Sequence, residues 1–464
     1  MIPLGKDAQG RVRSVARARE GRHLVNIGKT GSGKSGLNMQ ILLSWLGGGL
    51  PAVLVDPKGQ TAAELLAFVN YYDVVPPEEI GIINFFSSAY ATPFDPCAPL
   101  EGVDAFTRAD LLVSFVCGLV DGVGQRQADA LYWCARAVIS YGGSFSDIAE
   151  IMASDDYAAR FAVRVPDEEA RAFLERIADR VPALSRSALE SRARWLTRLP
   201  TLRATICARS CIPLDRLLPR RGLVVVDLGA APSADLADAL GSLVVGLLGR
   251  AVYARRSQAD GWLGEPPPPA LCVLEEAQRT IRSSAQDVED WLCAARSYGV
   301  SVALCTQTLR NRVFDEKFVA VLRENTSYEF MFRPDDATIS DLEHLLPVTG
   351  ARRSPVLPDR LCSKKEEIDL LAKQLRALPR RHFLFVDRSG EHDHLEALRT
   401  LELPYEAAKT AFRNLPKEKR QAYERGCLAR PFADLLREAH PSLPIETSVS
   451  GPTPVRGRAL KVAF

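Results

Sequence analysis

The stretch GKTGSGKS at residues 28–35 constrains the fold of this chain more than any other. It matches the phosphate-binding loop pattern in full, and it lies between a strand-like run, HLVNI, and an apolar helix-like run that ends at Trp45. A glycine-rich turn from a strand into a helix lets backbone N–H groups surround a phosphate, and the helix N-terminus adds partial positive charge. The stretch therefore predicts a nucleotide site on a parallel α/β sheet.

Further strand-like runs lie on both sides of a long helical stretch. They read PAVLVDPKG, IGIINF, GLVVVDLG, ALCVLE, GVSVALCTQ and SYEFMFR. We expect the first ordered strand at residues 23–27 and a late edge strand at residues 382–388. Together these runs predict an α/β fold of the RecA-like P-loop NTPase type, with a mostly parallel central sheet and an all-α insertion domain.

Changes in composition and periodicity divide the chain into predicted segments. Residues 100–220 are rich in Ala, Leu, Arg and Glu, with apolar residues at three- and four-residue spacing, which predicts the all-α insertion. The other predicted segments are a basic N-terminal segment at 1–22, the two parts of a P-loop ATPase domain at 23–99 and 221–403, a C-terminal helical segment at 404–440 and a flexible tail at 441–464.

Charge and hydropathy limit where the protein acts and what it binds. The net charge is only +2, so binding of nucleic acid would have to come from local basic patches. The first residues have no apolar core of a signal peptide, and the longest apolar runs are shorter than the roughly 20 residues of a membrane span. The ten cysteines lack the spacing of a zinc site, which favours free thiols. We therefore expect a soluble, cytoplasmic protein.

Two strand ends compete to supply the acid that a phosphate-transfer site needs. One strand ends in Asp227, and another ends in the adjacent pair Glu275 and Glu276. Adjacent acids can divide the work, since one can hold a magnesium-bound water while the other orients the attacking water. A further buried strand ends in Gln307, whose amide can bond the γ-phosphate and sense its loss. We favour Glu276 as the catalytic base and Glu275, with Ser35, as the magnesium site.

The order of these motifs resembles the HerA/FtsK superfamily of pumping P-loop ATPases, and most closely the soluble relatives of the TraG/TraD-type coupling ATPases of conjugation. The segments that carry the resemblance are GKTGSGKS, VDPKG, VVVDLG, LEEAQ, ARSYGVSVALCTQTL and NTSYEFMFRPDD, and together they span roughly residues 20–400. The resemblance implies ATP and Mg²⁺ as ligands. It also implies a ring, usually a hexamer, with ATP at subunit interfaces and DNA through the centre.

Residue roles carry over from this resemblance by position. Glu276 matches the catalytic glutamate, Gln307 the sensor and Arg296 an arginine inserted into the neighbouring subunit's site. Arginine suits that task because its planar fork stays charged and meets phosphate bidentately, although a helix-end arginine interacting with the dipole is the alternative for Arg296. Arg333 is a second candidate. The loop residues expected to bind the phosphates are Gly28, Lys29, Thr30, Gly31, Ser32, Gly33, Lys34 and Ser35, with Lys34 also stabilising charge during catalysis.

The chain also departs from that family. Glu275 stands where the family usually has Asp, which puts turnover more in doubt than binding. Asp56 and Lys58 match the family's strand-end motif, with no assigned chemical step. The transmembrane helices of coupling proteins proper have no counterpart in this sequence. Arginines that could contact DNA phosphates lie after the strand ends, at Arg279, Arg282, Arg310 and Arg312, and near the N-terminus, at Arg11, Arg13, Arg17, Arg19 and Arg22.

The leading hypothesis is a ring-forming, Mg²⁺-dependent ATPase that moves DNA, single- or double-stranded. One alternative is an ATP-gated scaffold that activates a partner nuclease or effector. Another is a secretion ATPase that docks on a membrane partner. A nuclease, a relaxase or a membrane-anchor protein is the expected kind of partner.

Overall fold

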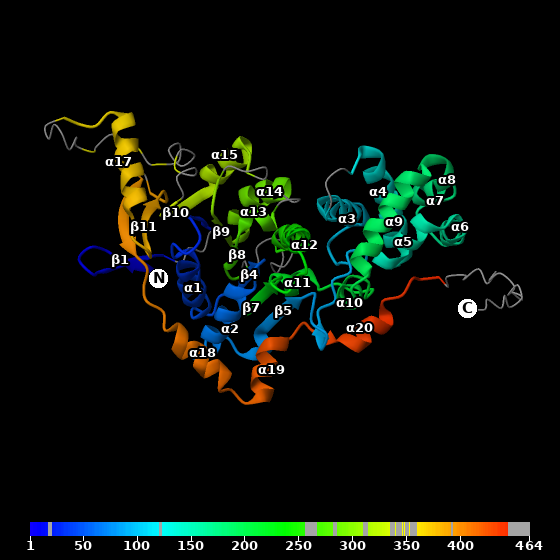
Figure 1. Cartoon of the computed structure of the whole chain (residues 1–464), viewed down its shortest axis with the longest axis horizontal. Coiled ribbons are helices and arrows are strands. Elements are labelled where there is room, and N and C mark those ends of the chain that lie inside the picture. The colour runs from blue at the N-terminus through cyan, green and yellow to red at the C-terminus, as the bar shows by residue number, and fades with distance from the viewer. Residues whose placement is uncertain are drawn as a thin grey trace, which may run out of the picture.

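The structure, a computed structural model, describes residues 1–16, 21–119, 123–255, 267–281, 285–309, 314–334, 339, 346, 348, 352, 360–390 and 393–443. Within these residues an eleven-stranded sheet has the order β2-β1-β12-β11-β10-β3-β9-β8-β4-β7-β5 (Figure 1). Its parallel part consists of β3 (His23–Ile27), β4 (Ala52–Asp56), β5 (Ile80–Asn84), β7 (Leu223–Asp227), β8 (Ala270–Leu274), β9 (Val300–Thr306) and β10 (Thr326–Phe332). The predicted mostly parallel α/β sheet is confirmed.

The other side of the sheet is antiparallel and differs from the prediction. It contains β11 (His382–Asp387), β12 (His394–Arg399), β1 (Ile2–Lys6) and β2 (Val12–Val15). The expectation that ordered structure begins at residue 23 is wrong, because β1 and β2 precede it. The expectation of an edge strand at 382–388 is also wrong, since β11 lies between β10 and β12. Short strands such as IPLGK and VRSV carry too little apolar periodicity to be recognised in the sequence.

Helices cover both faces of the sheet because its parallel strands are apolar on both sides. Along β4, Val53 and Val55 join one core and Ala52 and Leu54 the other, as the alternation of side chains along a strand requires. The core that contains Leu54 is completed by α1 (Lys34–Leu46) and α2 (Gln60–Tyr72). The core that contains Val53 is completed by α12 (Ala234–Ala254), α14 (Ala285–Ala295), α15 (Glu316–Asn325) and α17 (Lys364–Ala377).

Helix α12 is long and apolar enough to cross a bilayer, but 83% of its most apolar window is buried inside the protein. Its side chains, for example Leu240, Val244 and Leu248, pack on the face of the sheet that also carries α14 and α15. The side chain of Ser233 accepts a hydrogen bond from the backbone N–H of Leu236 and so begins the helix. The helix is therefore accounted for as a core element.

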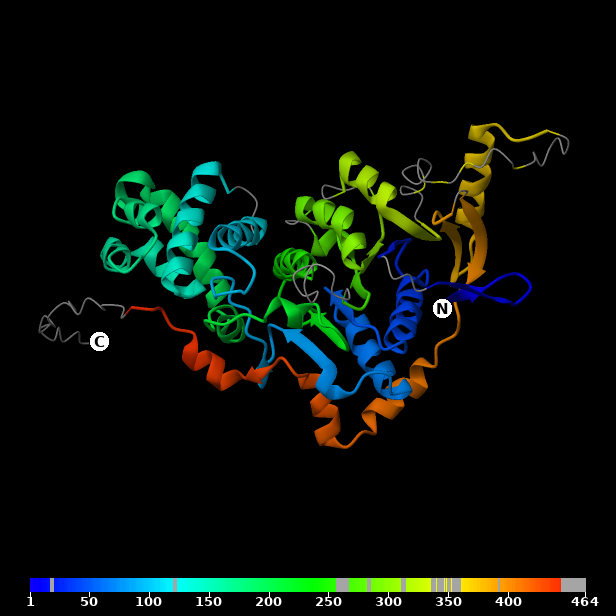
Figure 2. The ribbon, with the colours of Figure 1, turned by 180° about the vertical axis from the view of Figure 1, so that it is seen from behind.

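A block of helices lies between β6 (Tyr90–Ala91) and β7 and extends from one end of the sheet (Figures 1 and 2). A buried polar cluster around Asp147 helps to hold it. The Asp147 carboxylate accepts bonds from the backbone N–H of Ser144, at 2.8 Å, and from the hydroxyl of Tyr157, at 2.6 Å. The helices of this block are α3 (Ala105–Leu119), α4 (Gln125–Tyr141), α5 (Phe145–Ala153), α6 (Asp155–Ala162), α7 (Glu168–Leu174), α8 (Ile177–Arg180), α9 (Ala183–Thr197), α10 (Pro200–Ile206) and α11 (Leu214–Leu217).

The C-terminal segment runs back beneath the whole sheet, from β12 to the helical block (Figure 2). It contains α18 (Tyr405–Arg413), α19 (Lys417–Arg425), β13 (Arg430–Pro431) and α20 (Phe432–Glu438), which contact α2, β5, β6 and α10 in turn. The segment ends against the helical block, where the backbone N–H and the hydroxyl of Ser442 both donate to the carboxylate of Asp147, at 2.6 and 2.7 Å. One stretch of chain thus connects the sheet edge to the helical block.

Candidate nucleotide site

The loop at residues 28–35 connects β3 to α1 at the carboxyl edge of the parallel strands. Two of its glycines are required by close contacts. A Cβ on Gly28 would lie 2.7 Å from the Cβ of Phe332, and a Cβ on Gly33, whose φ is 121°, would lie 3.1 Å from the Cα of Arg381. The loop is therefore packed between β10 and the residues that precede β11.

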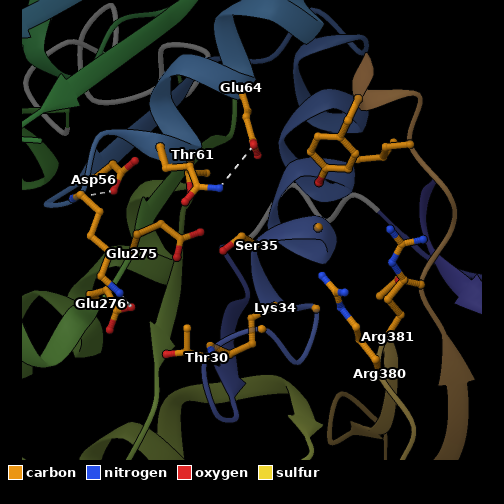
Figure 3. Close-up of a pocket in the computed structure, with 18 of the residues that line it drawn as sticks. Thr30, Lys34, Ser35, Asp56, Thr61, Glu64, Glu275, Glu276, Arg380 and Arg381 are labelled. Carbon is orange, nitrogen blue, oxygen red and sulfur yellow. Dashed lines mark hydrogen bonds and ion pairs between the residues drawn. The ribbon is translucent and has the colours of Figure 1, made fainter. Parts of the chain in front are cut away.

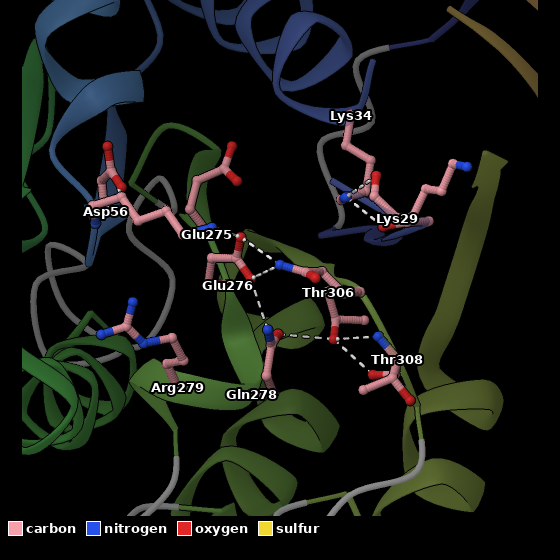
Figure 4. Close-up of polar contacts among 12 residues, drawn as sticks. Lys29, Lys34, Asp56, Glu275, Glu276, Gln278, Arg279, Thr306 and Thr308 are labelled. Carbon is pink, nitrogen blue, oxygen red and sulfur yellow. Dashed lines mark hydrogen bonds and ion pairs between the residues drawn. The ribbon is translucent and has the colours of Figure 1, made fainter. Parts of the chain in front are cut away.

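Lys34 folds back onto this loop. Its side chain is almost buried, at 8% exposed, and its Nζ donates to the carbonyl oxygens of Gly28 and Lys29, the latter at 3.1 Å (Figure 4). Three donors on a flexible stem let the ammonium exchange these carbonyls for phosphate oxygens. The lysine is thus held against the loop, where its donors could transfer to a phosphate.

Strand order decides which acids lie near the loop. From β3 outward the parallel strands run β9, β8, β4 and β7, so Gln307 at the end of β9 and the glutamate pair at the end of β8 come first. Asp56 ends the next strand, and its carboxylate accepts the backbone N–H of Lys58 and of Ala62, at 2.9 and 3.0 Å. Asp227 lies one strand further away and accepts the N–H of Gly229 at 2.9 Å. The topology therefore favours the glutamate pair over Asp227.

Glu276 has a strained backbone and a fully engaged side chain. Its φ of 47° and ψ of 51° lie in the left-handed region, which is uncommon for a residue with a Cβ and is often found at functional sites. Its carboxylate is paired with the Nζ of Lys58, and it accepts Nε2 of Gln278 at 2.7 Å and Nε2 of Gln307 at 3.0 and 2.8 Å (Figure 4). Burial raises the pKa of Glu276, but the bonds from Lys58, Gln278 and Gln307 outweigh it and leave the pKa lowered. The carboxylate is therefore ionised, and Lys58, Gln278 and Gln307 occupy it in this structure.

Glu275 is held in a different way. It is 5% exposed, and one carboxylate oxygen accepts Nδ2 of Asn38 at 2.9 Å, while Asn38 in turn accepts Nδ2 of Asn26 at 3.0 Å. Burial raises the pKa of Glu275, and the bond from Asn38 offsets this only in part. Figure 3 shows its carboxylate pointing toward the hydroxyl of Ser35. These hard oxygen donors fit a magnesium ion that keeps several of its waters.

Both glutamates line a cavity of about 530 Å³ that opens beside the loop. Its ends differ in composition, and we name them by their residues. The acid end contains Glu275, Glu276 and Lys58, and the arginine end contains Arg380, Arg381 and Tyr405. Figure 3 shows the two arginines on the side of the cavity opposite the glutamates, with Lys34 and Ser35 between them.

The arginine end and the partners Asn38 and Gln278 were not expected from the sequence, and Lys58 was expected at a strand end but without a role. Long-range pairing explains the first omission. β11 is antiparallel to β10, with Phe383 opposite Phe332, so the residues just before β11 arrive at the same edge as the phosphate loop. The run of basic residues before HFLFVD, LPRRHF, was the one available signal.

The remaining predicted arginines lie in several places. Arg296 is exposed just before β9, at the amino ends of the parallel strands, whereas the phosphate loop lies at their carboxyl ends. Its carbonyl accepts the N–H of Gly21 at 3.2 Å. The seven residues of β9 span roughly 20 Å, so Arg296 cannot reach the site of its own chain. Arg333 is exposed next to the loop, and its carbonyl accepts the N–H of Lys29 at 3.1 Å.

The arginines proposed for DNA contact are only partly described. Arg279 is engaged with Asp238 at 2.7 Å, a pair that DNA contact would have to break. Three N-terminal arginines also have partners: Arg11 with Asp7, Arg13 with Glu396 and Arg22 with the hydroxyl of Tyr328. Arg282, Arg310, Arg312, Arg17 and Arg19 lie outside the described residues.

The phosphate loop on β3, with acids and an amide at the ends of the next strands, defines the class of P-loop nucleotide-binding folds. Comparison with solved structures then shows which members share this fold. VirB4 of Thermoanaerobacter pseudethanolicus has a TM-score of 0.55 at 14% identity, covering 88% of this chain and 98% of its own. The bacterial conjugative coupling protein TrwBdeltaN70 has a TM-score of 0.54 at 16% identity, covering 86% and 89%.

A structure of the plasmid coupling protein TrwB in complex with ADP and Mg²⁺ is similar too, with a TM-score of 0.51 at 16% identity over 85% of this chain and 92% of its own. No family model matches the sequence, and no curated protein matches it. At these identities the likeness concerns the fold. The expected fold of the coupling ATPases is thus confirmed over most of the chain.

Proposed function

We propose that this protein is a Mg²⁺-dependent ATPase that uses hydrolysis to move DNA. The observation that carries the proposal is the placement of two polar side chains next to the phosphate loop. Gln307 follows β9, the strand beside β3, and Glu276 follows β8, the next strand, where it accepts the Gln307 amide. The fold shared with the conjugative coupling protein TrwB, a protein bound to ADP and Mg²⁺ in one of its structures, supports the choice of ligands and of cargo.

The residues divide the reaction between them. The loop N–H groups and Lys34 bind the phosphates, while Ser35 and Glu275 hold the metal, which neutralises charge on the phosphate oxygens when bound. Glu276 accepts a proton from the attacking water, a role that suits its ionised carboxylate. Before that, the carboxylate must exchange one of its present donors for the water.

Gln307 links the γ-phosphate to the rest of the molecule. In the structure the Gln307 amide donates to Glu276. A γ-phosphate in the site would offer the same amide a second acceptor, which would compete with Glu276. We propose that this exchange frees Glu276 and shifts the loop that follows β9. Arg310 and Arg312 follow Gln307 in the sequence, and we propose that they contact DNA phosphates together with Arg279 and Arg282.

Assembly follows from the position of Arg296. Because it lies at the edge of the sheet opposite its own phosphate loop, it can act on a nucleotide only in a neighbouring subunit. We propose a ring, most simply a hexamer, in which Arg296 enters the adjacent site and Arg333 flanks its own. The ring works in the cytoplasm, with a membrane-anchor protein, relaxase or nuclease as its partner.

The ATPase rate, measured with single-stranded DNA, double-stranded DNA and no DNA, tests this proposal. We expect one DNA form to stimulate hydrolysis at least several-fold, and the stimulation to vanish in the double variant Arg310→Ala/Arg312→Ala. The matched control Arg413→Ala/Lys417→Ala removes two exposed charges from the C-terminal segment and should leave stimulation intact. A rate indifferent to both DNA forms would contradict the motor and favour a scaffold that switches its assembly with ATP.

A further inference from the structure

The arginine end of the cavity has a charge that the rest of the site does not balance. Of the cavity's three lysines, Lys58 is paired with Glu276 and Lys409 with Glu64 at 3.2 Å, while Lys34 donates to the carbonyls of the phosphate loop. Within the described residues neither Arg380 nor Arg381 has an acidic side chain as a partner for its guanidinium. Two unpaired guanidinium groups beside a phosphate loop are the chemistry that recognises phosphate oxygens.

The backbone fixes these arginines against the loop. The N–H of Arg381 donates to the carbonyl of Ser32 at 2.8 Å, and its own carbonyl accepts the N–H of Thr400 at 2.9 Å. Arg381 also has a φ of 67°, in the left-handed region that a side chain with a Cβ rarely adopts. Its Cα lies 3.1 Å from the position of a Cβ on Gly33, so the backbone of Arg381 packs directly on the loop. Strained backbone conformations of this kind persist where the surrounding structure holds them, and here the phosphate loop does so.

The orientation of the nucleotide in the cavity follows from the acid end. Glu276 and Gln307 mark the γ-phosphate side, so the α-phosphate and the nucleoside extend toward the arginine end. Tyr405 agrees with this direction, since its hydroxyl lies 3.6 Å from the position of a Cβ on Gly36, in the first turn of α1. The N–H groups of that turn and loop surround the α- and β-phosphates in folds of this class.

We propose that Arg380 and Arg381 bind the α- and β-phosphates of the nucleotide from within the same chain, held in place by the docking of Arg381 on Ser32. The inference rests on the proposed function, because it concerns the nucleotide site of that ATPase. It adds an arginine contact that comes from the same chain and serves nucleotide binding. Arg296 acts between subunits, whereas Arg380 and Arg381 secure the nucleotide before and after hydrolysis.

The decisive variant is Arg381→Gly. Glycine adopts a φ of 67° without strain, so this change removes the guanidinium and keeps the backbone path. We expect the Tm of the protein without nucleotide to stay the same or rise. The affinity for fluorescent ADP and for fluorescent ATP should each fall about tenfold, and Arg381→Lys should recover part of the loss. The double variant Arg380→Ala/Arg381→Gly should bind more weakly still.

Kinetics separate this role from a catalytic one. Because α- and β-phosphate contacts are present in ATP and ADP alike, we expect a raised KM for ATP with kcat at saturation changed less than twofold. The control Arg413→Ala removes an exposed arginine from α18 outside the cavity and should change neither constant.

Three outcomes would overturn the inference. They are unchanged ADP affinity in the double variant, loss of ATP affinity alone, and an equal loss in the Arg413→Ala control. These measurements need neither DNA nor hydrolysis. Wild-type protein that binds nucleotide and is stimulated by DNA, together with unaffected arginine variants, would remove this inference and leave the proposed function standing. Wild-type protein that binds neither ATP nor ADP would remove the function itself.

Discussion

At the acid end of the cavity Lys58, Gln278 and Gln307 all donate to the carboxylate of Glu276, whereas at the arginine end the two guanidinium groups have no acidic partner among the described residues. Paired groups must exchange partners before they can act, so the acid end is suited to a step that depends on what is bound. Unpaired cations are ready to receive an anion at once. The difference suggests that binding and hydrolysis are divided between the two ends.

The largest effect should come from breaking the acid end. In Glu276→Gln the side chain can no longer accept a proton, so kcat should fall by roughly 10²–10⁴ while nucleotide affinity changes little. Asp227→Asn is the control, since Asp227 lies two strands beyond β8 and bonds its own turn. Steady-state hydrolysis together with ADP binding measures both. Intact hydrolysis in Glu276→Gln, with loss in Asp227→Asn, would reassign the catalytic acid.

A smaller, pH-dependent effect is expected from Lys58→Met. Lys58 helps to lower the pKa of Glu276, so its removal raises that pKa and the base becomes protonated at a higher pH. The acid limb of the kcat profile should therefore move to higher pH, with a loss that grows as the pH falls and less than twofold change near pH 8. Lys409→Met, which removes a lysine paired with Glu64 instead, should leave the profile where it is.

Glu275→Gln tests the difference between the two glutamates through the pH dependence of the free energy of unfolding. Burial raises the pKa of Glu275, so the ionised form is disfavoured in the folded protein. Its contribution to stability is therefore complete below the unfolded pKa of about 4.5 and is lost as pH rises through the folded pKa. Thermal unfolding without metal should show Glu275→Gln to be about 1 kcal/mol more stable than wild type at pH 8, with the gap closing near pH 4. A stability difference between the two proteins that does not change with pH would contradict a raised pKa of Glu275.

The smallest effect belongs to the arginine end. Tyr405→Phe removes only the hydroxyl that faces Gly36. The ring keeps its edge-to-face contact with Phe68, with ring centroids 5.0 Å apart. We expect ADP and ATP affinities to fall two- to threefold, with the same Tm and kcat. Isothermal titration resolves such a change, and identical affinities would place the nucleoside away from Tyr405.

The two ends also differ in how far the sequence predicted them. The loop, the glutamate pair and Gln307 each follow a continuous apolar run, so their place at the carboxyl edge could be inferred from local pattern and parallel pairing. Arg380 and Arg381 reach the cavity because β11, which follows them, pairs antiparallel with β10, and Tyr405 reaches it because α18 packs on α2. The basic run LPRRHF was the one local sign of either placement. The hydrogen bond from Asn38 to Glu275 joins positions 237 residues apart, a pairing that only the packing of α1 on β8 creates.

The C-terminal segment has a mechanical consequence. Within one uninterrupted run it supplies Tyr405 to the cavity wall, crosses beneath the sheet and anchors Ser442 on the buried Asp147 of the helical block. It is therefore a covalent connection between the wall of the nucleotide pocket and that block, along which a displacement of Tyr405 could reach Ser442. The block and the sheet also share one continuous apolar core, in which α3 and α11 pack against α12. Cutting the chain between α19 and α20 would therefore leave the block attached through that core and remove only the connection that starts at Tyr405.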